Sequence, residues 1–278
     1  MATVRLCCAL TSFSLVYLVV SLLTRNLIFS TAFPIDFHPV QQPRPFHISL
    51  ESLDSHSLRA RPHGQAYDQD GAEAREIAKV IPYFPFKGIP RFYDIAGFLS
   101  KPEVFQKIVD VFVERYRGIG IDAVAGMDAR GFVLGPPIAL ALKKPFIMIR
   151  KKGKMPNCIE SDSYECEYGK RSGMCLQRDA VKKGDRILII DDLVATGGTL
   201  SAGIQCVKML EGIVVECACV VELKMFIDPP EGSGLPNRTK MFEECGMGNV
   251  PVWGLISEDI LTEEAALPEG YVDDGEEH

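Results

Sequence analysis

Short apolar runs alternate with amphipathic stretches through the middle of the chain. Four runs have the length and composition of strands: IDAVAGM (121–127), PFIMIR (145–150), RILIID (186–191) and VVECACVVEL (214–223). Three stretches have helical periodicity: PEVFQKIVDVFVERYR (102–117), GFVLGPPIALAL (131–142) and TLSAGIQCVKMLEG (199–212). Continuous apolar runs are typical of parallel strands buried on both faces. The order of these elements predicts an α/β fold with a central, mostly parallel sheet flanked by helices.

The stretch 102–117 shows the helical period most clearly. Its apolar residues recur on one face, with a proline at the first turn: Val104, Ile108, Val111, Phe112 and Tyr116. In the stretch 131–142 we expect Pro136 and Pro137 to lie in the first turn, where a missing N–H is tolerated. Gly212 is expected to close the third helix.

Both ends of the chain differ from this middle part. Residues 6–23 carry no charge, which is typical of a membrane span or a long signal peptide, although an unused extension would look the same. We expect an apolar N-terminal segment over 1–30 and a disordered linker over 31–73. A folded domain over 74–256 would follow, and then an extension with an acidic tail over 257–278.

The composition is that of an ordinary globular protein. The chain has 278 residues, 47% of them hydrophobic and 24% charged, which is enough for one sizeable core. A net charge of -7 disfavours nucleic-acid binding. Lys and Arg nevertheless cluster in the stretch IRKKGK (149–154), which is where an anion site should be sought. The 9 cysteines include no CxxC pair, which disfavours a zinc ribbon and indicates reduced thiols in an intracellular protein.

The stretch ILIIDDLVATGGTL (187–200) carries the candidate chemistry. Parallel sheets bind ligands beyond the carboxyl ends of their strands, so Asp191 and Asp192 are expected there and need not be buried. A Gly-rich turn then enters a helix expected to start at Leu200, and N–H groups at a helix start bind anions. Two acids beside a phosphate cradle fit a sugar phosphate. The alternative is a capped helix with two solvated acids.

Two other phosphate-binding motifs are absent or out of context. The P-loop pattern GxxxxGK[ST] does not occur. GIGIDA (118–123) satisfies G-x-G-x-x-A, but it precedes a strand instead of following one, so we interpret it as a turn. The acid pair and its TGGT turn therefore remain as the main candidate site.

LIIDDLVATGGT (188–199) resembles the phosphoribosyl-diphosphate motif of type I phosphoribosyltransferases, in the Asp-Asp form of the adenine-specific branch. Three further stretches agree: GMDARGFVLGP (126–136), IRKKGKMP (149–156) and YECEYG (164–169). PRFYDI (90–95) and SEDILTEEA (257–265) resemble the kinetoplastid members, whose longer C-terminal segment packs on the partner subunit. The resemblance spans about 74–254 and implies the type I phosphoribosyltransferase fold, with a small hood and a flexible catalytic loop.

The resemblance also implies how the donor would be bound. Asp191 and Asp192 would hold the ribose hydroxyls, partly through Mg²⁺. The residues that would cradle the 5′-phosphate are Ala195, Thr196, Gly197, Gly198 and Thr199. The leaving diphosphate would meet a loop with a strained non-proline peptide and two flexible lysines: Asp128, Ala129, Arg130, Lys151 and Lys154. The guanidinium fork of Arg130 suits a diphosphate, although from the sequence alone this residue could form a surface ion pair.

The remaining implied roles concern catalysis and the base. Glu167 would handle the purine proton from a mobile loop, with Glu165 as its nearest rival, and Tyr168 would touch phosphate. From spacing alone, each of these residues could simply be solvated. The hood and the face of the base would involve Arg91, Phe92 and Leu223.

The expected activity is the transfer of the 5-phosphoribosyl group from phosphoribosyl diphosphate to adenine, giving AMP and diphosphate, with Mg²⁺ as cofactor. The resemblance implies a homodimer without a nucleic-acid partner. Contact with a membrane is expected only through residues 6–23, so we predict a cytoplasmic enzyme, with tethering as the alternative. Two other functions stay open: transfer to another purine base, and a non-catalytic module that binds the donor.

Overall fold

The computed structural model describes residues 67–86, 89–161, 164–166, 169–171 and 173–261. All of them belong to the compact unit 60–278. Over 84–86, 89–92, 164–166 and 169–171, only the backbone is described. The apolar segment 6–23 and the acidic tail lie outside the described residues. Within the described ranges, no helix is long and apolar enough to cross a membrane.

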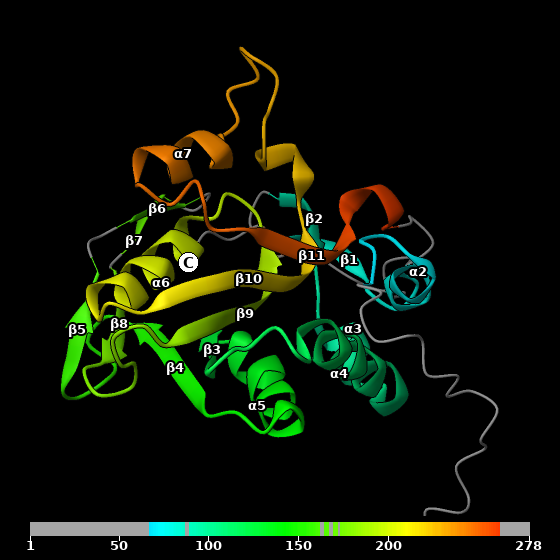
Figure 1. The fold of residues 1–278 in the computed structure, drawn as a ribbon. Helices are drawn as coiled ribbons and strands as arrows, with labels where there is room; N and C mark the ends of the chain where they lie inside the picture. The colour runs from blue at the N-terminus through cyan, green and yellow to red at the C-terminus, as the bar shows by residue number, and fades with distance from the viewer. Residues whose placement is uncertain (1–66, 87–88, 162–163, 167–168, 172, 262–278) are drawn as a thin grey trace, which may run out of the picture. The chain divides into compact units, whose positions relative to one another are not determined.

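A seven-stranded sheet forms the centre of this unit, in the order β11-β10-β9-β3-β4-β8-β5 (Figure 1). Its strands are β3 (Ala123–Met127), β4 (Phe146–Lys151), β5 (Cys158–Glu160), β8 (Met174–Gln177), β9 (Arg186–Val194), β10 (Ile213–Glu222) and β11 (Val252–Ser257). The five strands from β11 to β4 pair in parallel, whereas β8 is antiparallel to both β4 and β5. The predicted mostly parallel sheet is therefore confirmed.

The helices connect these strands and follow them. They are α2 (Ala72–Ala78), α3 (Ala96–Leu99), α4 (Pro102–Tyr116), α5 (Gly131–Leu142), α6 (Gly198–Met209) and α7 (Arg238–Glu244), with short 3₁₀ turns η2 (Lys224–Phe226) and η3 (Glu258–Ile260). The amphipathic pattern predicted for α4 is confirmed, because Ile108, Val111, Phe112 and Tyr116 are almost fully buried.

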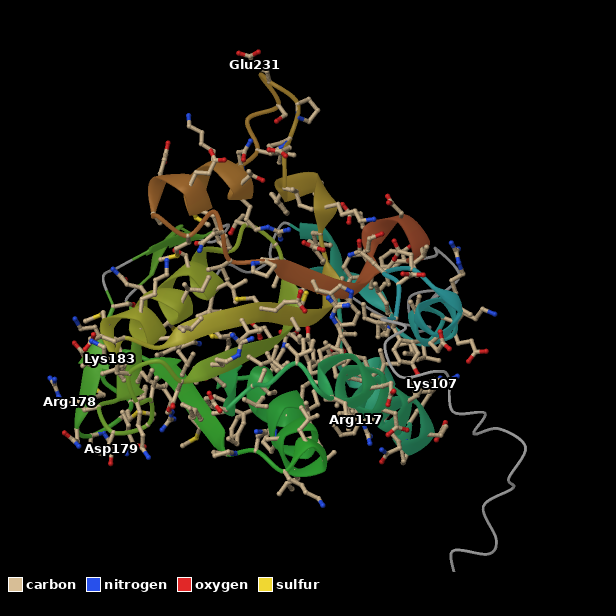
Figure 2. The ribbon with its side chains drawn as sticks, viewed as in Figure 1. Lys107, Arg117, Arg178, Asp179, Lys183 and Glu231 are labelled. Atoms are coloured by element: carbon tan, nitrogen blue, oxygen red, sulfur yellow. The ribbon has the colours of Figure 1, made fainter. Side chains whose placement is uncertain are left out.

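Each central strand supplies side chains to two hydrophobic cores, since successive strand residues point to opposite faces. On β9, Leu188 and Ile190 pack with α4 and α5, whereas Ile187 and Ile189 pack with α6 and α7. Figure 1 shows α4 and α5 on one side of the sheet and α6 on the other. The charged side chains labelled in Figure 2, among them Lys183, Arg178 and Asp179, point away from these layers.

Two small hairpins stand apart from the main sheet. β1 (Tyr83–Phe86) pairs antiparallel with β2 (Ile89–Tyr93), which contains the expected hood residues. β6 (Tyr164–Cys166) pairs antiparallel with β7 (Gly169–Arg171), and β6 lies against α6. The second hairpin therefore places the backbone of the predicted catalytic stretch beside the helix that follows the acid pair.

Three details of the predicted helices were wrong. Pro136 and Pro137 lie inside α5, beyond its first turn. They remove two backbone hydrogen bonds there, but the helix continues because Leu134 and Ile138 are fully buried against the sheet. α6 starts at Gly198 instead of Leu200, and at its end the left-handed residue is Glu211, not a glycine. The predicted turn at GIGIDA is confirmed by positive φ angles at Gly118 and Gly120.

The segment before α2 is joined to the last strand of the sheet. The backbone N–H of Asp70 donates to the Leu255 carbonyl at 3.0 Å. Its carboxylate accepts hydrogen bonds of 2.7 Å from the N–H and the hydroxyl of Ser257. Residues 67–73, which composition alone placed in the linker, thus contain contacts to β11.

Candidate active site

The acid pair lies where β9 extends beyond its neighbour β3. β9 pairs with β10 up to Val194, but its pairing with β3 ends at Ile190. Asp191 and Asp192 both belong to the strand itself, which runs three residues beyond the predicted end at Asp191. The sequence left their burial open: Asp192 is only 6% exposed, and Asp191 is partly buried.

The turn after β9 forms a pocket at the start of α6. Gly197 precedes the helix with a φ of 80°, a conformation that glycine adopts without strain. The pocket is lined by Asp191, Leu193, Val194, Ala195, Thr196, Gly197, Gly198, Thr199 and Leu200. All the residues predicted to cradle a phosphate are in this lining, beside one of the two acids. Backbone N–H groups at the start of α6 are suited to an anion in this pocket.

A second loop, after β3, reaches the acid pair through Arg130. The peptide bond between Asp128 and Ala129 is cis, and Arg130 directly precedes α5. Nη1 of Arg130 donates to Oδ2 of Asp192 at 3.0 Å. This is the ion pair that the sequence left open for Arg130, but it joins the predicted diphosphate loop to the predicted ribose site. The side chain of Arg130 is still 41% exposed, so it can also contact a ligand.

Two glycines allow this close approach of the loop to the sheet. A Cβ on Gly131 would lie 2.4 Å from the carbonyl oxygen of Ile190. A Cβ on Gly126 would lie 2.5 Å from the carbonyl oxygen of Gly131. A side chain with a Cβ atom at either position would therefore require movement of the backbone. The start of α5 is thus packed directly on β3 and β9, which places Arg130 beside the acids.

The basic loop after β4 is held against the same site. The backbone N–H of Lys151 donates to Oδ2 of Asp128 at 3.3 Å. Nε of Arg150 lies 3.8 Å from the same oxygen, and Nη1 of Arg150 donates to the Lys154 carbonyl at 2.8 Å. Lys151 and Lys154 themselves are exposed, as a loop that receives an anion requires. Arg150 was not predicted as a site residue, although it lies in the basic stretch that drew attention to this loop.

Burial and the neighbouring carboxylate make Asp191 costly to ionise. Burial raises the pKa of Asp191 well above its ordinary value, and the neighbouring Asp192 carboxylate raises it further. Arg130 and the backbone N–H of Asp192 act in the opposite direction, the latter through a 3.0 Å hydrogen bond to Oδ1 of Asp191. The site therefore favours a ligand that brings positive charge or hydrogen-bond donors to these carboxylates.

A family model described as the phosphoribosyl transferase domain matches residues 96–244, which is more than half of the chain. The chain belongs to the phosphoribosyltransferase family. Adenine phosphoribosyltransferase 2 of Arabidopsis thaliana is 52% identical over 151 residues, which are 54% of this chain and 78% of that protein.

Solved phosphoribosyltransferase structures have the same fold. The adenine phosphoribosyl transferase of Trypanosoma brucei, solved with AMP, pyrophosphate and ribose-5-phosphate, has a TM-score of 0.63 at 32% identity, over 71% of this chain and 84% of that one. The enzyme of Leishmania donovani has a TM-score of 0.64 at 28% identity, over 76% of this chain and 91% of that one. The predicted type I phosphoribosyltransferase fold is thus confirmed.

Several predicted residues of this phosphoribosyltransferase are described only in part. Glu167 and Tyr168 lie outside the described residues, and Glu165 is described only through the backbone of β6. Arg91 and Phe92 are likewise described only as backbone of β2. Their predicted roles therefore stay predictions. Leu223 is described in full: it is partly buried, and its N–H donates to the Val194 carbonyl at 2.9 Å, beside the pocket.

The described residues include no group of three or more His, Cys, Asp or Glu side chains that could hold a metal ion. Asp191 and Asp192 instead offer carboxylate oxygens from one strand end. Mg²⁺ commonly binds through one or two carboxylates, with water and ligand phosphates completing its shell. The carboxylate oxygens of Asp191 and Asp192 fit a Mg²⁺ ion whose shell is completed by ligand phosphates and water.

Proposed function

We propose that this phosphoribosyltransferase transfers the 5-phosphoribosyl group of phosphoribosyl diphosphate to adenine, which yields AMP and diphosphate. The observation that carries the proposal is the acid pair of β9, which leads into a phosphate-sized backbone cradle and is joined to Arg130. The relatives at 42–52% identity are adenine phosphoribosyltransferases, which supports adenine as the acceptor.

Each part of the site has a distinct task in this reaction. The backbone N–H groups of 196–199 bind the 5′-phosphate, and the carboxylates of Asp191 and Asp192 accept hydrogen bonds from the ribose hydroxyls. Negative charge develops on the diphosphate as its bond to the sugar breaks. Arg130 and the exposed lysines of the basic loop are placed to stabilise that charge. Arg150 and Asp128 hold the loop after β3 and the basic loop after β4 next to each other.

Two further components of the proposal are a metal ion and a proton carrier. Asp191 and Asp192 would help to hold Mg²⁺, which supplies charge neutralisation at the donor when bound. Glu167 would move the proton of the purine nitrogen, and closure of its loop would exclude water from the reactive sugar. General acid–base assistance of this kind contributes about 10²–10⁴-fold to the rate.

A homodimer is the proposed assembly. The helix α5 is apolar on nearly all sides, and such helices are normally buried. Val133 and Leu140, two turns apart on it, are nevertheless 40% and 78% exposed. A second copy of the chain would cover them. Sedimentation of the unmodified protein at micromolar concentration should give a dimer, and Leu140→Asp should shift it towards monomer; a monomeric unmodified protein would contradict this assembly.

The cytosol is the proposed compartment of the domain, with tethering through residues 6–23 as the alternative. The cysteines whose side chains the structure describes are free, and burial raises the pKa of Cys206 to about 11, so this thiol is poorly reactive. The chain also contains one glycosylation sequon in the described domain, Asn237-Arg238-Thr239. Its Asn237 caps α7, since Oδ1 accepts a hydrogen bond of 2.8 Å from the Lys240 N–H. A glycosidase-sensitive mobility shift that is lost in Asn237→Gln would place the domain in the secretory lumen instead.

The decisive experiment is an assay of adenine, guanine and hypoxanthine with phosphoribosyl diphosphate and Mg²⁺. We expect AMP and little product from the other two bases. Comparable or faster transfer to guanine or hypoxanthine would favour the alternative acceptor. Donor binding without turnover on any base would favour a non-catalytic, donor-binding module.

A further inference from the structure

A buried ion pair lies directly behind the phosphate loop. Arg238 of α7 and Glu222 at the end of β10 form a salt bridge in which the side chains are 5% and 7% exposed. The second carboxylate oxygen of Glu222 accepts a hydrogen bond of 2.9 Å from Nε2 of Gln69. Charged side chains are rarely buried to this extent, and a pair of this kind is weak evidence for stability. Its retention therefore calls for a role.

The head and the stem of Arg238 both touch the loop that receives the phosphate. Nη1 donates to the carbonyl oxygen of Ala195 at 3.3 Å. The stem covers Gly197 so closely that a Cβ there would lie 2.8 Å from Cδ of Arg238. Phe242, one turn further along α7, lies 3.2 Å from the same Cβ position. Arg238 therefore restrains the loop by a hydrogen bond at one end and by packing at the other.

The chain brings Arg238 to this place by a long excursion. After η2 it runs through a protruding loop with Glu231 at its tip (Figure 2) and returns as α7, beside α6 (Figure 1). Asn237 starts α7 by capping the N–H of Lys240, which orients the helix at its first turn. Phe242 then joins the core under α6.

We propose that Arg238 is a positioning residue for the binding of the 5′-phosphate. It holds the backbone of 195–197 in the conformation that presents N–H groups to the ligand, and Glu222 and Gln69 hold Arg238. The guanidinium is buried behind the loop, so it acts through the loop and does not itself receive the phosphate. This inference rests on the proposed function of the loop as the 5′-phosphate site.

The phosphate is remote from the bond that breaks, which determines the kinetic effect. Loss of a contact that is equally strong in the ground state and the transition state raises KM and leaves kcat unchanged. A loosened phosphate loop should therefore raise KM for phosphoribosyl diphosphate about tenfold, with kcat changed by less than about threefold. KM for adenine should stay within about twofold.

The test removes both charges, because removal of Arg238 alone would leave the Glu222 carboxylate buried without a positively charged partner. Arg238→Met with Glu222→Gln keeps the volume of both side chains. The matched control is Arg115→Met with Glu216→Gln, a pair between α4 and the same strand β10, with side chains 16% and 15% exposed and an N–O distance of 3.0 Å. Glu216 precedes Glu222 by roughly 20 Å of strand, so the control pair is remote from the loop.

Both double variants should have a lower Tm, but only the Arg238 variant should raise KM for the donor and weaken AMP binding, each about tenfold. An unchanged donor KM in the folded Arg238 variant, or an equal rise in the control, would overturn the inference. If the double variant does not fold, Arg238→Lys keeps the charge but not the fork. It should then raise the donor KM by a smaller factor, and no rise would equally overturn the inference. An unmodified protein without transfer activity would refute the proposed function, and the inference with it.

Discussion

Gly131→Ala should lower activity much more than stability, because it displaces the loop that carries Arg130 and disturbs the hydrophobic core little. The added Cβ would lie 2.4 Å from the Ile190 carbonyl oxygen and 3.1 Å from the Gly126 carbonyl carbon. The first distance is about 1 Å short of ordinary contact, and the obstacle is backbone of the central sheet, which cannot rotate away. The start of α5 must therefore retreat by about 1 Å.

Two magnitudes follow from this retreat. Overpacking of a close contact costs about 1–3 kcal/mol, and up to about 1 kcal/mol of that is offset by the higher helix propensity of alanine. The net loss of about 1–2 kcal/mol corresponds to a decrease in Tm of roughly 2–8 °C for a domain of this size. Arg130 directly precedes Gly131, so it moves as well. A misplacement of 1 Å can lower the rate about 10²-fold.

The measurements are Tm by circular dichroism and kcat/KM with adenine and the donor. Gly248→Ala is the control: its nearest neighbour would be a side-chain carbon of exposed Glu243, which can move aside. We expect the control to keep unmodified values of both quantities. A Gly131→Ala protein with unchanged Tm and kcat/KM would show that the close approach of α5 to the sheet does not position Arg130.

Four further predictions concern acidic residues. Asp191→Asn should raise Tm of the ligand-free protein by about 2–4 °C, because burial opposes the charge there, yet weaken donor binding; a variant that binds the donor normally would refute the ribose role. Since burial raises the pKa of Asp191, protons compete with the donor, so apparent donor affinity should decrease as the pH falls through that raised pKa, while Asp191→Asn should show a flatter profile. The same raised pKa means that the ligand-free fold is most stable below the ordinary pKa of an unfolded Asp, and that it loses this stability as the pH rises from there through the raised pKa of Asp191. Glu167→Gln should lower kcat about 10²-fold with donor binding retained, whereas Glu165→Gln should change little; the reverse order would assign the proton transfer to Glu165.

The sequence by itself determined the kinds of elements in the predicted strands and helices, and the location of the Gly-rich turn proposed to bind phosphate. Helical and strand periods, and the step from apolar strand to Asp191-Asp192 and glycine, are local patterns that depend on residues close together in the chain. The buried face of α4, the four predicted strands and the residues lining the pocket at the start of α6 were therefore correct. The strands β1, β2, β5, β6, β7, β8 and β11 were not predicted. The two prolines of α5 show the limit of such patterns, because burial of Leu134 and Ile138 outweighed two lost hydrogen bonds.

Only the tertiary structure decided how separate motifs meet. Arg130 pairs with Asp192 because β3 lies next to β9 in the sheet, and β9 extends past it. Arg150 and Arg238 gained their positions in the same way, through contacts between segments that are remote in sequence. Strand order and the close approach of two backbones depend on the packing of the whole domain, which no local period encodes. The burial of Asp192 and the restraint on the phosphate loop follow from that packing.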